Sequence, residues 1–313
     1  MKIAFFIITL LLFLNSCVNE SVLNKETKVV LLAERHDYYG KFEIQLELLK
    51  KFNSENQVRY ILFEQPHTTG VRVREFFETG DSLTLKDFLV SEASLVNKDH
   101  KPLYNFYISL YEYYLSLDDN KRFNLQFIDI ESYKTHNIQT WLEILRKTKN
   151  QKLNNLLDQI EFQPDSYESS ISTVNLLKEL CSDKSLLEGH KFKNDLSIIK
   201  QGFSIENRDS LMYIRILDLL KKTESGLIFG QFGSWHICRE NDGNLINLLE
   251  KSELLNTTKS LKSVKLNFTL PNTAPNSLKD SDFGVLRKVD DRDDNCKYDF
   301  SISLKSRKGR FLR

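Results

Sequence analysis

Val29-Val30-Leu31-Leu32-Ala33-Glu34-Arg35-His36 is an apolar run that ends on a histidine, and two later runs in this 313-residue chain end in the same way. They are Tyr60-Ile61-Leu62-Phe63-Glu64-Gln65-Pro66-His67 and Leu227-Ile228-Phe229-Gly230-Gln231-Phe232-Gly233-Ser234-Trp235-His236. All three are short, rich in β-branched or aromatic residues and flanked by polar segments, which is typical of buried strands. The carboxyl ends of the strands form the ligand crevice of an open α/β sheet. We therefore expect the side chains that end these runs to meet in one crevice: Glu34, His36, Glu64 and His236.

Helical patterns alternate with the predicted strands. Apolar residues recur at mostly helical spacing over 41–52, between the first two strands, and this order favours a parallel pairing. A helical, aromatic segment over 72–118 precedes a third strand at 124–130, and a helix over 205–222 leads into the strand that ends at His236. The sequence thus predicts an α/β fold with a largely parallel central sheet flanked by helices.

The helical segment 72–118 carries a tyrosine stripe. Its members recur at spacings of three and four, which places them on one helix face: Tyr104, Tyr107, Tyr111 and Tyr114. We expect this stripe to pack in the core, and a ligand-facing wall is the minority interpretation.

Domain boundaries follow from changes in composition. Residues 28–270 form the predicted α/β domain, and Leu-rich amphipathic patterns over 138–200 predict a helical lobe inserted in it. A strand is expected at 263–270. A C-terminal extension over 271–313 begins with a polar, acid-rich loop, and apolar and polar residues alternate from Tyr298 to Leu304. That alternation predicts an antiparallel edge strand.

The N-terminus has the pattern of a targeting segment. Lys2 precedes an apolar run over 3–14 that is too short to span a bilayer. The following Leu14-Asn15-Ser16-Cys17 resembles a bacterial lipobox, in which the cysteine is lipidated and begins the mature protein. We expect a signal peptide over 1–16, a tether over 17–27 from lipidated Cys17, and anchoring to a membrane of the cell envelope, the outer membrane being favoured. A plain secretory peptide with an incidental cysteine is the alternative.

The charge composition of the chain bears on the kind of partner that it binds. The chain has 44 basic and 43 acidic residues and a net charge of +1, which gives no electrostatic footprint for nucleic acid. We expect a small-molecule substrate instead, and the sequence sets no oligomeric state. Beside Cys17 the cysteines are Cys181, Cys238 and Cys296, so an exported protein can form one disulfide, by a pair that the sequence leaves open.

The Glu34-Arg35-His36 triplet is a candidate for acid/base chemistry. Residues two apart in an extended segment point to the same side, so Glu34 and His36 should face together. A neighbouring carboxylate orients the imidazole, which makes His36 a plausible general base for activating water. A strand-end histidine satisfied by a neighbour is the structural alternative. Arg35 beside it is a candidate for binding substrate.

The other strand ends supply further candidates. Glu64 ends an apolar run and should be paired, because a buried glutamate is rare without a partner. Two glycines precede His236 and predict a tight turn or a close backbone approach. His67 follows Pro66, so we expect it on a loop, outside the site. Four charged residues near the same edge are candidates for fixed charge or substrate binding: Asp129, Glu131, Arg208 and Asp209.

Several known signatures are absent from the sequence. It has no GxSxG elbow, no P-loop, no GxGxxG after a strand and no HExxH. These absences weaken serine-hydrolase, nucleotide-binding and zincin interpretations.

Together the motifs resemble the opening and distal parts of the erythromycin esterase and ChaN-like superfamily. A strand ending in Glu-x-His is followed by a helix and by a strand ending in Glu64. Asn207-Arg208-Asp209-Ser210-Leu211-Met212 resembles the family's arginine-bearing helix, and the run to His236 resembles its distal Gly-x-x-His strand. Phe77-Glu78-Thr79-Gly80-Asp81 resembles a "TGD" element of the esterase branch. The matches span about residues 28–240.

The resemblance implies an α/β fold with a largely parallel sheet and a helical lobe, and it implies more than one activity. In the esterase branch the first-strand histidine activates water without a required metal, a role that falls here on His36, with Glu34, Glu64, Arg208 and His236 as its companions. In the ChaN branch lipoproteins bind haem and are linked to iron uptake, and a related branch contains metal-dependent peptidases. A metal here would be held by the two glutamates and two histidines that end the strands: His36, Glu34, Glu64 and His236.

The chain departs from the family pattern at Ala33, where a glycine is usual. The Glu-x-His spacing is ChaN-like, whereas the TGD element and the Arg-Asp helix are esterase-like. Three hypotheses follow: a membrane-anchored ester hydrolase as the leading one, a haem- or metal-binding lipoprotein, and a surface lipoprotein that has lost the chemistry.

Overall fold

A computed structural model describes residues 23–34, 41–94, 100–131, 135–147, 150–160, 167–180, 208–223, 225–255, 259–267, 286–288 and 296–303. The predicted signal peptide, Cys17, Arg35, His36 and Cys181 lie outside these residues. Within them, no helix is long and apolar enough to cross a membrane.

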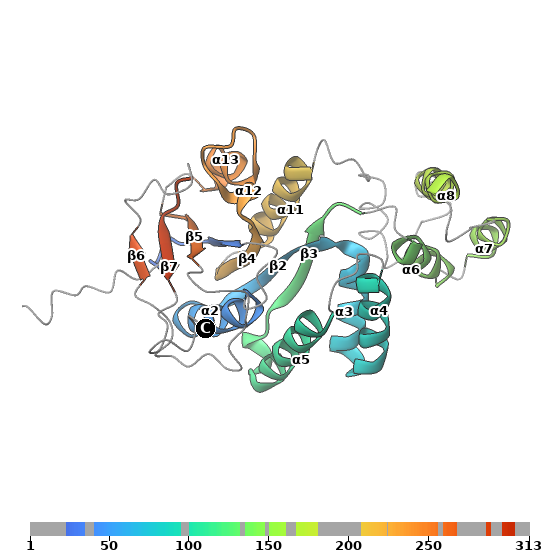
Figure 1. The fold of residues 1–313 in the computed structure, drawn as a ribbon, viewed down its shortest axis with the longest axis horizontal. Helices are drawn as coiled ribbons and strands as arrows, with labels where there is room; N and C mark the ends of the chain where they lie inside the picture. Colours follow the sequence, from blue (N-terminus) through green and yellow to red (C-terminus); the bar gives the residue numbers. More distant parts are fainter. Residues whose placement is uncertain are drawn as a thin grey trace, which may run out of the picture.

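One twisted sheet organises the chain (Figure 1). Its strand order is β3-β2-β4-β1-β5-β7-β6, and every pairing is parallel except that of β6 with β7. This architecture confirms the predicted α/β fold with a largely parallel sheet. The strands are β1 (Val29–Glu34), β2 (Val58–Pro66), β3 (Asn124–Asp129), β4 (Leu227–Gly233), β5 (Leu261–Asn267), β6 (Leu286–Lys288) and β7 (Phe300–Ser303).

The middle of the sheet is a topological switch point. The chain leaves β1 toward β2 and β3 on one side, then returns to place β4 between β2 and β1 and crosses to β5 on the other side. Ligand crevices of open α/β sheets lie at such points, outside the carboxyl ends of the strands. The register aligns Glu34, the last residue of β1, with Gly233, the last residue of β4.

Helices cover both faces of the sheet (Figure 1). On one face lie α2 (Lys41–Glu55), α3 (His67–Thr79), α4 (Ser82–Ser94) and α5 (Lys101–Ser116). On the other lie α11 (Arg208–Lys222), α12 (Ser234–Ile237) and α13 (Leu245–Glu250). Short 3-10 turns are described at η1 (Asp119–Lys121) and η3 (Glu253–Leu255).

Strand β1 shows why two helical layers form. Val30 and Leu32 pack with α2 and α5 in one core cluster, and Val29 and Leu31 pack with α11 and α13 in another. Alternate side chains of a strand point to opposite faces, so a strand that is apolar throughout needs cover on both. All six residues of β1 are buried.

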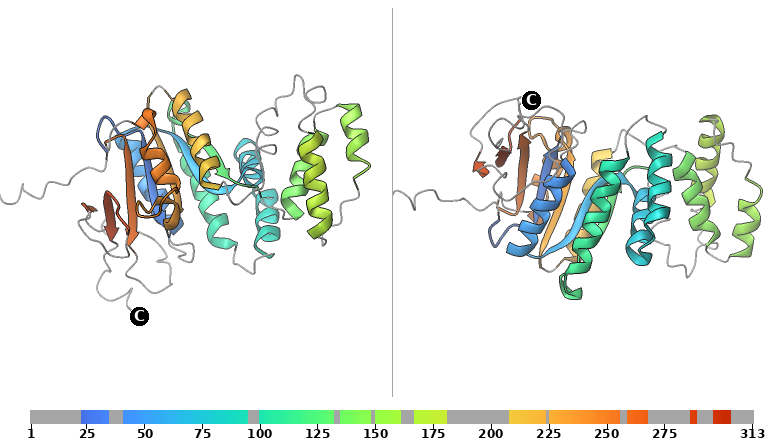
Figure 2. Two further views of the ribbon diagram at one scale, coloured as in Figure 1. Left: turned by 90° about the horizontal axis from the view of Figure 1, so that it is seen from above. Right: turned by 60° about the horizontal axis from the view of Figure 1, so that its bottom comes forward.

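The predicted helical lobe has its own core. It contains α6 (Thr135–Arg146), α7 (Gln151–Leu157) and α8 (Tyr167–Leu180), whose buried residues form a separate cluster around Trp141. Figure 2 shows these helices beyond α3 and α4, away from the sheet. Val71 of α3 packs against this cluster and connects the lobe to the domain.

The tyrosine stripe packs in the core, as expected. Tyr107 is fully buried, and Tyr104, Tyr111 and Tyr114 are partly buried against the same cluster. The hydroxyl of Tyr107 donates a hydrogen bond to Oε1 of Gln65, so the stripe ties α5 to the end of β2.

Two local predictions are wrong. His67 is not on a loop: it begins α3, is buried, and stacks on Trp141 with ring centroids 5.7 Å apart. The strand predicted from Tyr298 to Leu304 is not at the edge, and although its pairing with β6 is antiparallel, as predicted, its pairing with β5 is parallel. It forms β7, which runs parallel to β5, and β6 pairs outside it. Alternating polarity shows that one face of a strand is solvated, but it does not fix the direction of pairing.

A disulfide joins Cys238 and Cys296, which resolves the pairing that the sequence left open. The bond spans 58 residues and connects the end of α12 with the segment that leads into β7. It therefore fixes the C-terminal strand to the turn after β4.

Gly70 lets α3 lie close to the sheet. A Cβ at this position would lie 2.5 Å from Cδ2 of Phe127, a buried residue of β3. Gly70→Ala should lower the free energy of unfolding by about 1–3 kcal/mol, because overpacking outweighs the better helix propensity of alanine. Urea denaturation measures the change. The exposed Glu78→Ala in the same helix is the control and should be nearly neutral.

The cause can be checked by a double-mutant cycle with Phe127→Leu, which removes the ring atoms that the new methyl would meet. The two changes should be strongly non-additive. Additive losses would show that the close packing of Gly70 on Phe127 is not the reason for the destabilisation.

Candidate functional site

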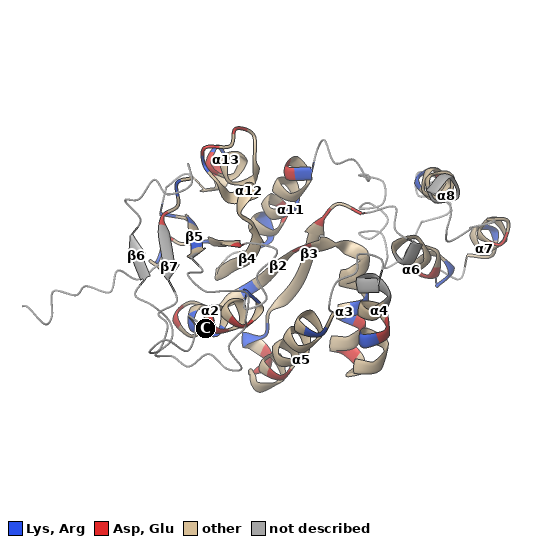
Figure 3. Ribbon diagram, in the orientation of Figure 1, with Lys and Arg blue, Asp and Glu red and all other residues tan. Residues whose placement is uncertain are grey.

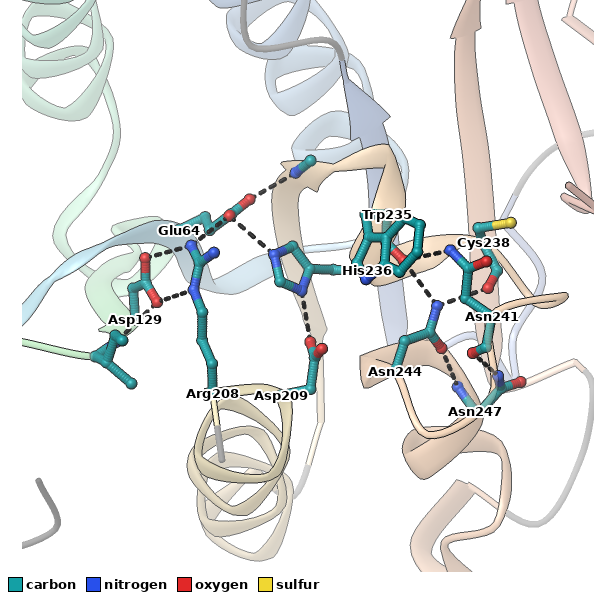
Figure 4. Close-up of polar contacts among 12 residues, drawn as sticks. Glu64, Asp129, Arg208, Asp209, Trp235, His236, Cys238, Asn241, Asn244 and Asn247 are labelled. Atoms are coloured by element: carbon teal, nitrogen blue, oxygen red, sulfur yellow. Dashed lines mark hydrogen bonds and ion pairs between the residues drawn. The ribbon is translucent and has the colours of Figure 1, made fainter. Parts of the chain in front are cut away.

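Five charged side chains from four segments meet at the carboxyl edge of the sheet (Figure 4). Glu64 lies near the end of β2 and Asp129 ends β3. Arg208 and Asp209 begin α11, and His236 lies in the short helix α12 that follows β4. In Figure 3, basic and acidic residues lie together at the start of α11, close to acidic residues at the end of β3.

Arg208 bridges two strand ends. Its Nε and Nη2 donate to the two carboxylate oxygens of Asp129, both at 2.6 Å, and Nη2 also donates to Oε1 of Glu64 at 2.6 Å. A guanidinium presents its donors in a rigid fork that matches a carboxylate. Burial alone would lower the pKa of Arg208, but Asp129 and Glu64 raise it above its ordinary value.

Glu64 is the centre of the arrangement. Its Oε1 lies 2.6 Å from Arg208 Nη2 and 3.1 Å from Nε2 of His236, and its Oε2 accepts the backbone N–H of Gly233 at 2.6 Å. Burial alone would raise the pKa of Glu64, but the hydrogen bond and charge of His236, the Gly233 N–H and the charge of Arg208 lower it to about 2. Glu64 therefore stays ionised near neutral pH.

His236 lies between two carboxylates. Its Nδ1 is 2.6 Å from Oδ1 of Asp209, and its Nε2 faces Glu64. Burial alone would lower the pKa of His236, but the hydrogen bonds to Asp209 and Glu64, with the charges of both, raise it to about 9. The imidazole is thus a fixed cation near neutral pH, with both nitrogens donating.

The glycines before His236 have the predicted roles. A Cβ on Gly230 would lie 2.6 Å from Phe232 and 3.0 Å from Leu62, so this is a close approach of β4 to its surroundings. Gly233 is the N-cap of α12 and donates its N–H to Glu64. The glycine-containing segment therefore sets where both the N–H and the imidazole lie.

Glu34 ends β1 with a different partner. Its carboxylate is 6% exposed and pairs with Nζ of Lys41 at 2.9 Å, where α2 begins. Arg35 and His36 lie outside the described residues, so the expected pairing of Glu34 with His36 stays a prediction. Lys41 was not among the predicted site residues. Its position at the start of the helix after β1 is the signal that could have identified it.

Glu131 forms a second polar cluster. Its oxygens accept the backbone N–H of Thr68 at 3.1 Å and the Thr68 hydroxyl at 2.9 Å, which satisfies the N-terminus of α3. Pro66, the N-cap of α3, offers no side-chain cap. Burial raises the pKa of Glu131 to about 7, although Thr68 and the charge of Arg215 act in the opposite direction. This carboxyl fixes α3 to the end of β3 rather than joining the contacts of Arg208.

The charged set contains three carboxylates and two cations, and Arg208 is the member that can bind an anion: Glu64, Asp129, Arg208, Asp209 and His236. Two cations stand at the edge, each fixed by carboxylates before any ligand binds. Within the described residues, Nη1 of Arg208 has no hydrogen-bond partner, and the side chain is 28% exposed. A preorganised donor of this kind stabilises an anion or an oxyanion without reorganisation at the moment of reaction.

His236 makes stability depend on pH. A pKa raised from 6.5 to about 9 contributes stability that is fully present below pH 6.5 and is lost as the pH rises through 9. Asp209→Asn should therefore lower the free energy of unfolding by roughly 1–2 kcal/mol at pH 6 and by much less at pH 10. Denaturation at both pH values measures this. Asp218→Asn on the exposed part of the same helix should show no such difference, and an equal loss at both values for Asp209→Asn would contradict the assignment.

Glu131 makes stability depend on pH in the same direction, but over a lower pH range. Its raised pKa contributes stability that is fully present below pH 4.5 and is lost as the pH rises through 7. Glu131→Gln keeps an acceptor for Thr68 and cannot ionise. The difference in free energy of unfolding between this variant and the native protein should therefore shift in favour of the variant by on the order of 1 kcal/mol from pH 5 to pH 8. Parallel stability profiles from pH 5 to 8 would contradict a carboxyl that titrates near neutrality.

No family model and no curated protein matches the chain. Solved structures do. A Bacillus cereus protein is similar at 15% identity and a TM-score of 0.50, over 77% of this chain and 66% of that one. A mutant of the erythromycin esterase EreC in its open conformation is similar at 14% identity and a TM-score of 0.48, over 80% of this chain and 72% of that one. ChaN of Campylobacter jejuni, described with cofacial haem, is similar at 16% identity and a TM-score of 0.38, over 90% and 89%.

At these identities a likeness bears on the fold alone. The chain spans just under two thirds of the Bacillus cereus protein, so the activity of a whole relative does not pass to it. The likeness in fold is to the Bacillus cereus protein, at a TM-score of 0.50.

Proposed function

We propose that the protein is a membrane-anchored hydrolase that cleaves an ester or a related acyl bond of a small molecule. The observation that carries this proposal is the pair of cations at the carboxyl edge, Arg208 and His236, held in place by Glu64, Asp129 and Asp209. Hydrolysis of an ester passes through a tetrahedral intermediate whose oxygen carries negative charge. Fixed cationic donors are what such an intermediate needs.

Arg208 is the group that would contact this oxygen. Its Nε and Nη2 bind Asp129 and Glu64, which fix the plane of the guanidinium and leave Nη1 without a hydrogen-bond partner among the described residues. His236 supports it through Glu64, since both of its nitrogens face carboxylates. Glu64, with a pKa of about 2, would hold the two cations and would not transfer a proton.

The base in this proposal is His36. It follows Glu34 by two residues in the sequence. Glu34 is aligned with Gly233, whose N–H binds Glu64. An imidazole in that neighbourhood could take the proton of a water that attacks the acyl carbon, while the oxyanion develops against Arg208. The convergence of Glu64 and His236 weighs against a fold that has lost its chemistry.

A haem or metal role fits the described residues poorly. An axial imidazole ligand needs a free nitrogen, whereas both nitrogens of His236 are bound to carboxylates and the ring stays protonated to about pH 9. Among the described residues, no group of three or more His, Cys, Asp and Glu side chains could hold a metal ion. His36 and Glu34 remain predicted ligands from the sequence, and the hydrolase needs neither cofactor.

Anchoring to the cell envelope through Cys17 belongs to the same proposal. The support from the structure is the Cys238–Cys296 disulfide, because such bonds persist in oxidising compartments and are rare in the cytosol. The lipobox-like Leu14-Asn15-Ser16-Cys17 supplies the modification site.

The test is turnover of p-nitrophenyl acetate by single variants. Arg208→Gln should lower kcat/KM by about 10²–10³-fold, and Arg208→Lys should recover little, since an ammonium lacks the fork that binds Asp129 and Glu64. His36→Ala should abolish turnover with the fold intact by circular dichroism. Arg72→Gln is the matched control, because Arg72 also pairs with two carboxylates, Glu75 and Glu143, but away from the site.

Full activity of a folded Arg208→Gln or His36→Ala variant would overturn the mechanism. Activity that falls equally in Arg72→Gln would show that the effect comes from stability rather than from the site. Native protein that turns over no ester in a panel of acyl chain lengths would remove the hydrolase proposal itself.

A further inference from the structure

Trp235 is exposed at a point where the chain around it is largely buried. It is 69% exposed and the preceding Ser234 is exposed too, whereas Phe232, Gly233, His236 and Ile237 are buried. Burying a large aromatic side chain is favourable, so an exposed indole gives up that contribution. The turn presents the ring to solvent next to the site.

The backbone under the indole is firmly held. Asn244, which is 3% exposed, donates from Nδ2 to the carbonyl oxygens of Trp235 at 2.8 Å and of Cys238 at 2.6 Å. Asn241 adds a longer bond to the same Trp235 oxygen at 3.3 Å. The disulfide from Cys238 to Cys296 fixes the other end of the turn. The exposure of Trp235 is thus a property of a braced turn and not of a loose loop.

The turn lies at the carboxyl edge, beside the charged set. In Figure 4 the imidazole of His236 points toward Glu64 and Arg208, and the indole of Trp235 lies beyond it, toward Asn241 and Asn244. The two side chains come from consecutive residues, so the indole is carried by the same short helix as an imidazole of the charged set.

An isolated exposed aromatic side chain is better suited to binding a small ligand than to binding the large apolar surface of a protein or a membrane. Protein partners and membranes bind contiguous apolar patches. The other exposed large apolar residues of the described part lie on α4, α5, α8, α11 and η3: Leu83, Val90, Leu115, Leu176, Ile214 and Leu254. None comes from the turn that carries Trp235.

We propose that Trp235 is a substrate-binding residue that stacks on the flat face of a ring, so that the enzyme prefers esters with an aromatic or pyranose ring beside the scissile bond. This rests on the proposed hydrolase function. The acyl group would face Arg208 while the ring lies against the indole. Its contribution is to binding, so it should change KM and leave kcat nearly unchanged for a ring-bearing substrate.

The first test compares esters with and without a ring. Benzyl acetate and 6-O-acetylglucose carry an aromatic and a pyranose ring, and ethyl acetate carries none. Trp235→Ala should lower kcat/KM about threefold to tenfold for a ring-bearing ester, through KM, and leave ethyl acetate unchanged. Trp235→Phe should restore most of the loss. Leu83→Ala, equally exposed at 69% but on α4, is the matched control and should change nothing.

The second test does not depend on turnover. The chain has two tryptophans, and Trp141 is fully buried, so acrylamide should quench chiefly Trp235. Benzyl alcohol or methyl α-D-glucoside should protect the fluorescence from acrylamide, whereas ethanol should not. Trp235→Phe gives the background from Trp141.

The outcomes separate the two proposals. If the native protein hydrolyses none of the esters, the hydrolase proposal fails and the quenching experiment alone decides the role of Trp235. Protection by one probe identifies the kind of ring. An equal loss of ethyl acetate turnover in Trp235→Ala, no protection by any ring, or protection only by phospholipid vesicles would overturn the inference.

Discussion

The buried carboxylate of Glu64 at the end of a central strand is the constraint on which the site depends. An ionised carboxylate in such a place is costly unless donors surround it. Three donors from distant parts of the chain do so: the Arg208 guanidinium, the His236 imidazole and the Gly233 N–H. Asp129 and Asp209 then neutralise the outer sides of the two cations. Each charge in this set of five side chains is therefore stabilised by its neighbours.

The charges of Glu64 and His236 explain why the proposed general base lies outside this set of five side chains. Glu64 and His236 have pKa values pushed apart, to about 2 and about 9, and both stay charged near neutral pH. A general base must change its protonation state within the working range. In the proposed hydrolase the central pair therefore holds Arg208 in place, and the base would come from another residue. This division separates the residues that hold charge from those that move protons.

Much of this arrangement could be predicted from the sequence. Side chains alternate between the two faces of a strand, and the ligand crevice of an open α/β sheet lies at the carboxyl ends of its strands, so the side chains at those ends can be located. Glu64, Asp129 and His236 follow from the apolar runs before them, and Arg208 and Asp209 from the helix that they begin. The sequence could not give the partner of Glu131, because the chain turns after β3 and the carboxylate meets the start of α3. The helical start at His67 was readable in principle, since a proline often precedes or opens a helix. The direction of β7 depends on long-range pairing, which local alternation does not encode.

The position of β4 has a consequence for how the protein is made. Strand β4 inserts between β2 and β1, and Val29 pairs with Ile228, so the centre of the sheet closes a loop of nearly 200 residues. Pairing of strands that are so far apart in the sequence is slow. A chain that is synthesised from its N-terminus cannot complete this pairing early. The charged set also comes from both sides of β4 in the sequence, since Glu64 and Asp129 precede this strand and His236 follows it. A nascent chain therefore cannot complete the centre of its sheet until β4, in its last third, has been synthesised.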